Sequence, residues 1–142
     1  MRGSLYACAL LLSGALLSGC SDSSTFVNDQ LGCNDVRSFS VGNSTSGRLS
    51  SSDCLLQDGS AVDYYRVNVS GNRTLHVVLT SDEFNPYVVI MDRSGNVVAE
   101  EDNGGTGFSE LVTNLPSDTY YIAATSFDVG DYGQYQLETQ YE

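Results

Sequence analysis

The chain contains no lysine and no tryptophan, and only one histidine and two prolines among its 142 residues. Six arginines stand against 18 acidic residues, which gives a formal net charge of −12 at pH 7. Nucleic acid is excluded as a partner, because its binding depends on cationic contacts to phosphate. The same balance argues against electrostatic adhesion to anionic lipid. It favours a partner that is cationic, or a divalent cation.

Motifs that carry catalysis are also missing. The sequence has no HExxH, no GK[ST] and no GxGxxG. The single histidine, His76, is expected in the middle of a strand on its outer face, without a nucleophile elbow nearby. The acidic residues lie in predicted loops and do not form a carboxylate pair in an apolar cleft. We therefore predict that the chain is not an enzyme.

The N-terminus carries a targeting signal. An apolar run over residues 5–17 is too short to span a bilayer comfortably and follows Arg2. It closes on Leu17-Ser18-Gly19-Cys20, which resembles the lipobox of bacterial lipoproteins. A plain signal peptide is the alternative, but it does not explain the cysteine. We expect a lipoprotein signal peptide at residues 1–19.

Lipidation is predicted at Cys20, and residues 20–31 are expected to be the lipidated N-terminus and a polar tether. Two or more acyl chains anchor stably where one does not. Ser21 resembles the residue that follows the lipidated cysteine in outer-membrane lipoproteins. We therefore expect a lipid-anchored protein of the bacterial cell envelope, at the outer membrane.

Two cysteines, Cys33 and Cys54, remain outside the signal and the anchor. In an exported protein such a pair is expected to form a disulfide. Closing a loop of this length stabilises a fold by about 3 kcal/mol in the chain-entropy model. A metal site is the alternative, but there is no CxxC, and His76 is distant in sequence.

From residue 32 to residue 142 the pattern is that of one β domain. Apolar side chains alternate along 62–69, 74–80, 119–125 and 133–139, and no helical period persists for three turns. Inward-facing positions are predicted to be Tyr65, Val67, Val69, Leu75, Val77, Leu79, Tyr120, Ile122, Ala124, Tyr135 and Leu137. Turns rich in Gly, Asn, Asp and Ser separate the strands. This spacing predicts an all-β antiparallel sandwich of about eight strands.

A hairpin is predicted around Arg93-Ser94-Gly95-Asn96. The expected register pairs Asp92 with Val97, Ile90 with Ala99, Val88 with Glu101, and Pro86 with Asn103. Acidic and amide side chains from two segments would then meet at one rim, namely Asp82, Asn85, Glu101, Asp102 and Asn103.

Calcium takes oxygen ligands from carboxylates, amides and carbonyls, which such loops supply. The rim of the hairpin is one candidate site. Asp53, Asp58 and Asp63, which lead into the strand at 62–69, form the other. The alternative is that these residues are solvated and bond to the nearby main chain in turns.

Four tyrosines are predicted to point away from the core: Tyr64, Tyr121, Tyr132 and Tyr141. They could form a stacking surface for glycans or protein ligands. The alternative, which we prefer, is cross-strand pairing and cover for sheet edges.

Several short elements, in this order and spacing, resemble the bacterial pre-peptidase C-terminal domain over residues 47–139. They are Gly47-x-Leu49, Asp63-Tyr64-Tyr65, Phe84-x-Pro86-Tyr87, Ser94-Gly95-Asn96, Asp102-x-Gly104-Gly105, Tyr120-Tyr121-Ile122 and Gly133-x-Tyr135-x-Leu137. The resemblance implies a jelly-roll-like β-sandwich without catalytic activity. It also implies kinship with calcium-dependent collagen-binding domains, whose acids near the corresponding strand entry favour the Asp53, Asp58 and Asp63 site.

The function expected from the sequence is that of a non-catalytic, lipid-anchored, extracytoplasmic binding module, stabilised by calcium. Its ligand would be a protein or a polysaccharide at the cell envelope. The alternative is a structural lipoprotein of the envelope with no dedicated ligand.

Overall fold

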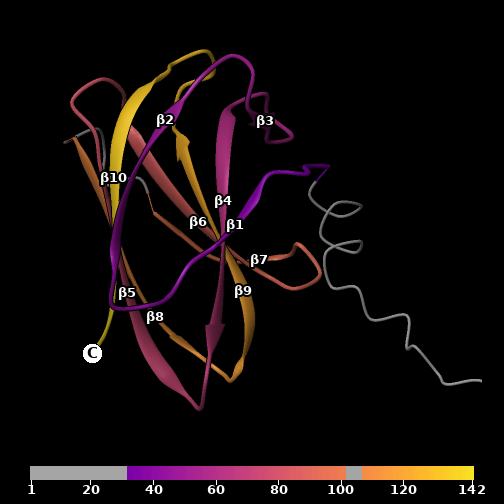
Figure 1. Cartoon of the computed structure of the whole chain (residues 1–142), viewed down its shortest axis with the longest axis vertical. Helices are drawn as coiled ribbons and strands as arrows, with labels where there is room; N and C mark the ends of the chain where they lie inside the picture. The colour runs from indigo at the N-terminus through magenta and orange to yellow at the C-terminus, as the bar shows by residue number, and fades with distance from the viewer. Residues whose placement is uncertain (1–31, 102–106) are drawn as a thin grey trace, which may run out of the picture.

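The structure is a computed structural model that describes residues 32–101 and 107–142. It is a sandwich of two sheets (Figure 1). Sheet A has the order β1-β4-β9-β6-β7, with β3 also paired to β4, and sheet B has the order β2-β10-β5-β8. The strands are β1 (Val36–Ser38), β2 (Ser44–Leu49), β3 (Cys54–Leu55), β4 (Ala61–Val69), β5 (Arg73–Thr80), β6 (Pro86–Asp92), β7 (Val97–Glu101), β8 (Phe108–Leu115), β9 (Asp118–Ser126) and β10 (Gly133–Tyr141).

The predicted all-β sandwich is confirmed. Eight strands have five or more residues, and the two additional ones, β1 and β3, are short segments beside the same edge of β4. β1 runs parallel to β4, with Val36 opposite Tyr64, whereas the sequence indicated antiparallel pairs throughout. Within the described ranges, no helix is long and apolar enough to cross a membrane.

The core lies between the two sheets and follows the predicted alternation. Inward side chains of both sheets form one apolar cluster, in which Val67, Leu79 and Ile122 have no exposed surface. Successive residues of a strand point to opposite faces, so this alternation places every second side chain in the core. All the predicted inward positions are members of this cluster.

The outer faces of the two sheets differ. Sheet B alternates buried residues with half-buried ones along β5 and with exposed ones along β10, whereas β9 is buried from Tyr120 to Ser126. A second apolar cluster lies on the outer face of sheet A and consists of Cys33, Val62, Tyr64, Val89, Met91, Tyr121 and Ala123. Strands buried on both faces have continuous apolar sequences. Sheet B is therefore the layer whose outer face is open to solvent.

The hairpin of β6 and β7 has the predicted register over most of its length. Ile90 pairs with Ala99 and Val88 with Glu101. A β-bulge then shifts the pairing, so that Met91, and not Asp92, faces Val97. The predicted pair of Asp92 with Val97 is wrong because a bulge adds one unpaired residue to a strand.

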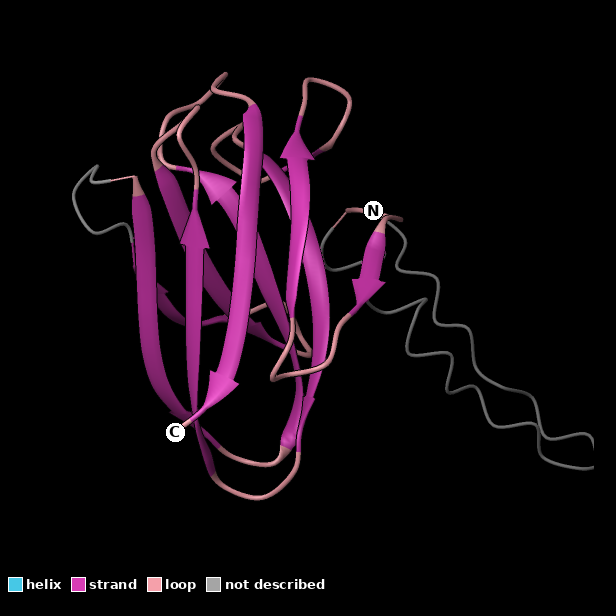
Figure 2. Ribbon diagram, turned by 60° about the vertical axis from the view of Figure 1, so that its left-hand side comes forward, coloured by secondary structure: helices cyan, strands magenta, loops and turns pink. Residues whose placement is uncertain are grey.

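Two groups of connections close the sandwich at its opposite ends (Figures 1 and 2). We call one the loop end, formed by residues 50–60, 81–85, 107 and 127–132, at the top of both views. The other is the turn end, formed by residues 39–43, 70–72, 93–96 and 116–117. Hydrogen bonds from Ser81 N to Gly107 O (3.0 Å) and from Phe127 N to Asn85 O (2.9 Å) join three of the loops at the loop end.

Candidate functional site

Most of the predicted metal ligands lie at or beside the loop end. Asp53, Asp58, Asp82 and Asn85 are in its loops, and Glu101 ends β7 next to it. Asp63 lies two residues into β4. Asp102 and Asn103 are outside the described residues, as is the lipidation site Cys20. The two candidate calcium sites therefore lie at the same end of the sandwich.

The carboxylates of the first candidate site, Asp53, Asp58 and Asp63, each form hydrogen bonds with other groups of the protein. The Oδ2 atom of Asp53 accepts a hydrogen bond from Ser50 N (2.6 Å), and Asp58 Oδ1 accepts one from Ser60 N (2.9 Å). Asp63 is 5% exposed and binds side chains of two other strands. In the described part of the chain, no three His, Cys, Asp or Glu side chains form a group that could hold a metal ion.

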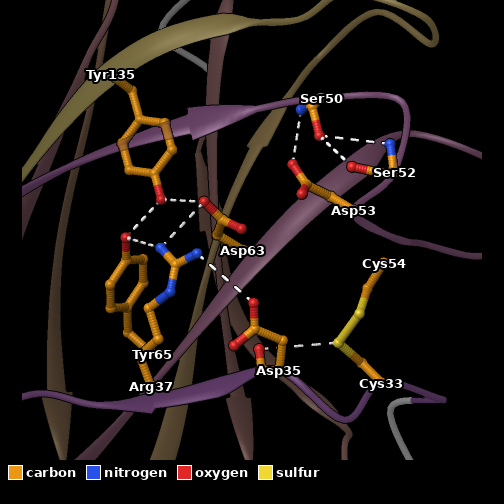
Figure 3. Close-up of polar contacts among 10 residues, drawn as sticks. All are labelled: Cys33, Asp35, Arg37, Ser50, Ser52, Asp53, Cys54, Asp63, Tyr65 and Tyr135. Atoms are coloured by element: carbon orange, nitrogen blue, oxygen red, sulfur yellow. Dashed lines mark hydrogen bonds and ion pairs between the residues drawn. A yellow bond between two sulfur atoms is a disulfide. The ribbon is translucent and has the colours of Figure 1, made fainter.

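Asp63 belongs to a polar network that joins the two sheets, shown in Figure 3. We call Arg37, Asp63, Tyr65 and Tyr135 the inter-sheet clamp. The hydroxyl of Tyr135, on β10 of sheet B, donates to the carboxylate of Asp63, on β4 of sheet A. Because the hydroxyl proton of Tyr135 is donated to Asp63, the Tyr65 hydroxyl must be the donor in its hydrogen bond with the Tyr135 oxygen.

Arg37, on β1, completes the clamp from the solvent side. Its Nη1 atom donates to Tyr65 Oη (3.1 Å) and lies 3.4 Å from Asp63 Oδ2. Its Nη2 atom lies 3.7 Å from the exposed carboxylate of Asp35. The short parallel strand β1 thus positions the positive charge that the buried carboxylate needs.

The clamp has unusual electrostatics. Burial raises the pKa of Asp63 above its ordinary value, and the Tyr135 hydrogen bond and the Arg37 charge reduce this rise without cancelling it. Burial lowers the pKa of Arg37, but the Asp63 carboxylate together with Tyr65 and Tyr135 outweighs it and leaves that pKa above its ordinary value. The Tyr135 pKa is also raised, through burial and through its hydrogen bond to Asp63. The clamp therefore links the two sheets through a buried carboxylate, which the Tyr135 hydroxyl and the Arg37 guanidinium stabilise.

Sequence reasoning missed the clamp and assigned Asp63 to calcium. Period-two alternation places Asp63 on the same face as Tyr65, and hence toward the core, which was the signal available. Gly47 belongs to the same arrangement. It pairs with Tyr135, and an added Cβ there would overlap the Tyr135 phenol ring. Several elements of the family resemblance, around Gly47, Asp63 and Tyr135, are thus explained by packing.

At the other candidate site, one oxygen has no partner. The Oδ1 atom of Asn85 is buried and accepts no hydrogen bond from the described residues. Asp82, three residues earlier, is exposed. A buried acceptor without a donor costs free energy unless water or a cation satisfies it.

The loop end exposes apolar side chains. The described residues include eight large exposed hydrophobic side chains. Four lie in the loop end, and a fifth, Phe108, begins the adjoining strand; the four are Leu55, Phe127, Val129 and Tyr132, between 41% and 60% exposed. The same loops contain six carboxylates and no arginine, the acids being Asp53, Asp58, Asp82, Glu83, Asp128 and Asp131. Arg48 lies just outside and pairs with Glu83 at 3.7 Å.

The four tyrosines do not form a common stacking surface, which is in line with the alternative that the sequence favoured. Tyr64 and Tyr121 are each 2% exposed and belong to the second apolar cluster, and burial raises the pKa of Tyr64 to about 12. Tyr141 packs against Arg73, whose guanidinium carbon is 4.5 Å from the ring centroid. Only Tyr132 is exposed, because the outer face of sheet A is covered.

His76 lies on the outer face of sheet B, as predicted. Its Nε2 atom is 2.6 Å from Glu110 Oε1 and its Nδ1 atom is 3.0 Å from Gln140 Nε2. Neither partner is a hydroxyl or a thiol, so the described residues around His76 do not form a Ser-His or Cys-His pair.

No protein-family model matches the sequence, and no curated protein matches it significantly. Solved structures do share its fold. The pre-peptidase C-terminal domain of a collagenase from Bacillus anthracis is 19% identical with a TM-score of 0.58, covering 74% of this chain and 94% of that one. A periplasmic inhibitor of g-type lysozyme from Aeromonas hydrophila is 10% identical with a TM-score of 0.52, covering 76% and 98%. Its counterpart from Salmonella Typhimurium is 13% identical with a TM-score of 0.49, covering 75% and 98%.

At these identities the likeness establishes the fold alone. The chain has the β-sandwich fold of a pre-peptidase C-terminal domain, as the resemblance in its sequence implied.

Proposed function

We propose that this chain is a non-catalytic binding module, lipid-anchored at Cys20 in the bacterial cell envelope, which binds a protein partner through its loop end. The observation that carries the proposal is the coincidence of exposed apolar side chains with six carboxylates in the same loops. The fold neighbours agree with a binding role, since one of them is an inhibitor of g-type lysozyme, and so binds a protein.

The chemistry of the loop end specifies the kind of partner. Exposed Phe127, Val129 and Tyr132 can each enter a pocket on a partner and exclude water there, which is how a few residues dominate binding energy. The surrounding carboxylates accelerate encounter with a positively charged surface and reject a negative one. A protein with a cationic patch around an apolar depression fits both features.

A binding test follows from this chemistry. The purified protein is measured by biolayer interferometry against immobilised cationic and anionic proteins, with a g-type lysozyme among them. We expect saturable binding to a cationic protein that weakens with salt. The double variant Phe127→Ser/Val129→Ser should lose at least about tenfold in affinity. Val112→Ser, which removes a valine of β8 that is 48% exposed, should bind like the wild type.

Two results contradict the proposal. Binding that survives the double variant places the surface elsewhere. If no protein binds, the runner-up function stands, a structural envelope lipoprotein without a dedicated ligand. Lysozyme inhibition is measured in the same series, since loss of lysozyme activity would identify the partner class directly.

The anchor is tested separately. Mass spectrometry of the mature N-terminus should show a diacylglycerol thioether on Cys20, and fractionation should recover the protein with outer membranes. A freely secreted, unmodified chain contradicts this part of the proposal and leaves the binding surface unaffected.

Calcium at the rim of the hairpin is a second candidate property, favoured by the unpartnered Asn85 Oδ1. At about 100 times its dissociation constant, an ion bound only by the native state stabilises it by about 2.7 kcal/mol. The Tm difference between calcium and EDTA is therefore the readout. Asn85→Ala should abolish this difference and Glu138→Gln, on the exposed face of β10, should retain it. Superimposed melts of the wild type reject both candidate calcium sites.

A further inference from the structure

The outer face of sheet B contains two hollows that lie end to end along β10. The larger, of about 600 Å³, is lined by Gln134 and Gln136, and the smaller, of about 390 Å³, by Glu138 and Gln140. Strands β2 and β5 supply the walls on either side of β10 in both hollows. Together they form a strip that runs from Gln134 to Gln140, about 20 Å at the rise of an extended strand.

The sequence of β10 produces this strip. Its inward residues are Tyr135, Leu137 and Thr139, and its outward residues are all long and polar and all exposed: Gln134, Gln136, Glu138 and Gln140. The outward residues of neighbouring β2 include Ser44 and Ser46, whose short side chains leave space beside the glutamines.

The side-chain amides along the strip are available to bind a ligand. The side-chain amides of Gln134 and Gln136 make no hydrogen bond to the rest of the described residues, although their backbones do. The Gln140 amide donates to His76 Nδ1, and His76 Nε2 in turn donates to Glu110. This relay fixes the Gln140 side chain and leaves its carbonyl free to accept. A primary amide offers donors and acceptors together, which complements hydroxyl groups.

The charge and polarity of the strip exclude two kinds of polymer. A protein interface of ordinary stability has an apolar centre, and the outward residues of the strip include one apolar side chain, Val78. Nucleic acid requires several cations, and Arg48 is the single arginine that lines the hollows. Arg48 pairs with Glu83, and the carboxylates that line the hollows are those of Asp82 and Glu138, so the strip carries few charges on a molecule of net charge −12.

We propose that the outer face of sheet B binds an uncharged polysaccharide chain that lies along β10 from Gln134 to Gln140. The glutamine amides bond to sugar hydroxyls, and the two hollows accommodate successive sugar rings. This site is separate from the loop end and does not depend on the protein partner proposed there.

Side-chain amide NMR of the purified, ¹⁵N-labelled protein tests the proposal. The probes are four hexasaccharides at millimolar concentration: cellohexaose, laminarihexaose, maltohexaose and the N-acetylglucosamine hexamer. We expect one of them to give saturable shifts of the amide resonances of Gln134, Gln136 and Gln140. Gln57, an exposed glutamine of the loop end, is the internal control and should not move.

Variants make the test specific. Gln134→Ala/Gln136→Ala removes two amides and should weaken binding of the active hexamer by about tenfold. Gln57→Ala should leave binding unchanged. The proposal is overturned if no hexamer moves the strip, if the double variant binds normally, or if the strip responds only to a protein partner. The last outcome would assign the strip to a protein interface.

Discussion

The two ends of the sandwich are built from the same kind of connection and yet differ in length and chemistry. At the turn end the connections have two to five residues, contain no acidic residue and expose none of the eight large hydrophobic side chains. At the loop end the three connections that the structure describes in full, residues 50–60, 81–85 and 127–132, have five residues or more, contain six carboxylates and expose four such side chains.

The short connections of the turn end are sufficient to close the fold, whereas the longer loops of the loop end contain residues that closure does not require. Connections between strands in compact domains have a median length of about four to six residues, so the turn end contains little beyond closure. The additional residues of the loop end expose apolar groups to water at a cost in solubility, and the proposed partner surface would account for them. Conversely, the loop end is held by constraints that the turn end lacks: the disulfide between Cys33 and Cys54 and the nearby inter-sheet clamp.

Removing the disulfide should have the largest effect on stability. The sequence separation of Cys33 and Cys54 is 21 residues, and Cys33→Ser/Cys54→Ser should lower the free energy of unfolding by about 3 kcal/mol. Urea unfolding measures this, with the reduced wild type as the control. An unchanged midpoint would show that the loop end needs no covalent constraint.

Breaking the clamp should have the next largest effect. Tyr135→Phe removes the hydroxyl that donates to Asp63 and accepts from Tyr65, and leaves a buried carboxylate without its donor. The expected loss in unfolding free energy is about 2 kcal/mol. Phe39→Leu, which alters another ring packed on Tyr65 but no hydrogen bond, is the matched control.

The same network should make stability depend on pH. Because the folded pKa of Asp63 is raised, its favourable contribution is complete below the unfolded pKa and is lost as pH rises through the folded pKa. Asp63→Asn does not titrate, so its stability relative to the wild type should increase as pH rises from about 4 to neutrality. Urea midpoints of both proteins across this range provide the measurement, and parallel curves would contradict the assignment.

A turn-end substitution should act on stability alone. Gly95 has φ 82°, in the left-handed region, and its N–H bonds to Asp92 O at 3.0 Å. Gly95→Ala should cost about 1 kcal/mol in unfolding free energy. Partner binding at the loop end should be unchanged. A loss of binding would mean that the two ends do not act separately.

The smallest effect on stability is expected for the loop-end residues that matter most for binding. Phe127→Ser/Val129→Ser should change the unfolding free energy by no more than about 0.5 kcal/mol, since both side chains are more than half exposed. Thermal denaturation beside Val112→Ser measures it. A large loss of stability would show that these side chains support the fold.

Regular alternation made the core predictable. Leu75, Val77 and Leu79 face inward because period two leaves them no other choice once one face is buried. The disulfide followed from the count of cysteines. Asp63 was expected among calcium ligands because a carboxylate near a strand entry suggested a wet loop. The clamp was not foreseen, because the partners Tyr135 and Arg37 lie on other strands that local sequence does not relate to Asp63.

The bulge at Ile90 and Met91 and the cover over Tyr64 were also invisible, because each depends on a neighbouring element. In the sequence, Phe127 and Val129 stand beside turn residues, which indicates that they are exposed. Their common position with Leu55 at the loop end depends on the fold, which the sequence pattern does not show.

The most direct test of the loop end as the recognition surface is site-specific photocrosslinking in intact bacterial cells. A photoreactive residue replaces Val129 at the loop end or Asn72 at the turn end, both in loops away from the core. We predict a discrete protein crosslink from position 129 and none from position 72. Equal crosslinking from both positions, or crosslinking from position 72 alone, would contradict the account.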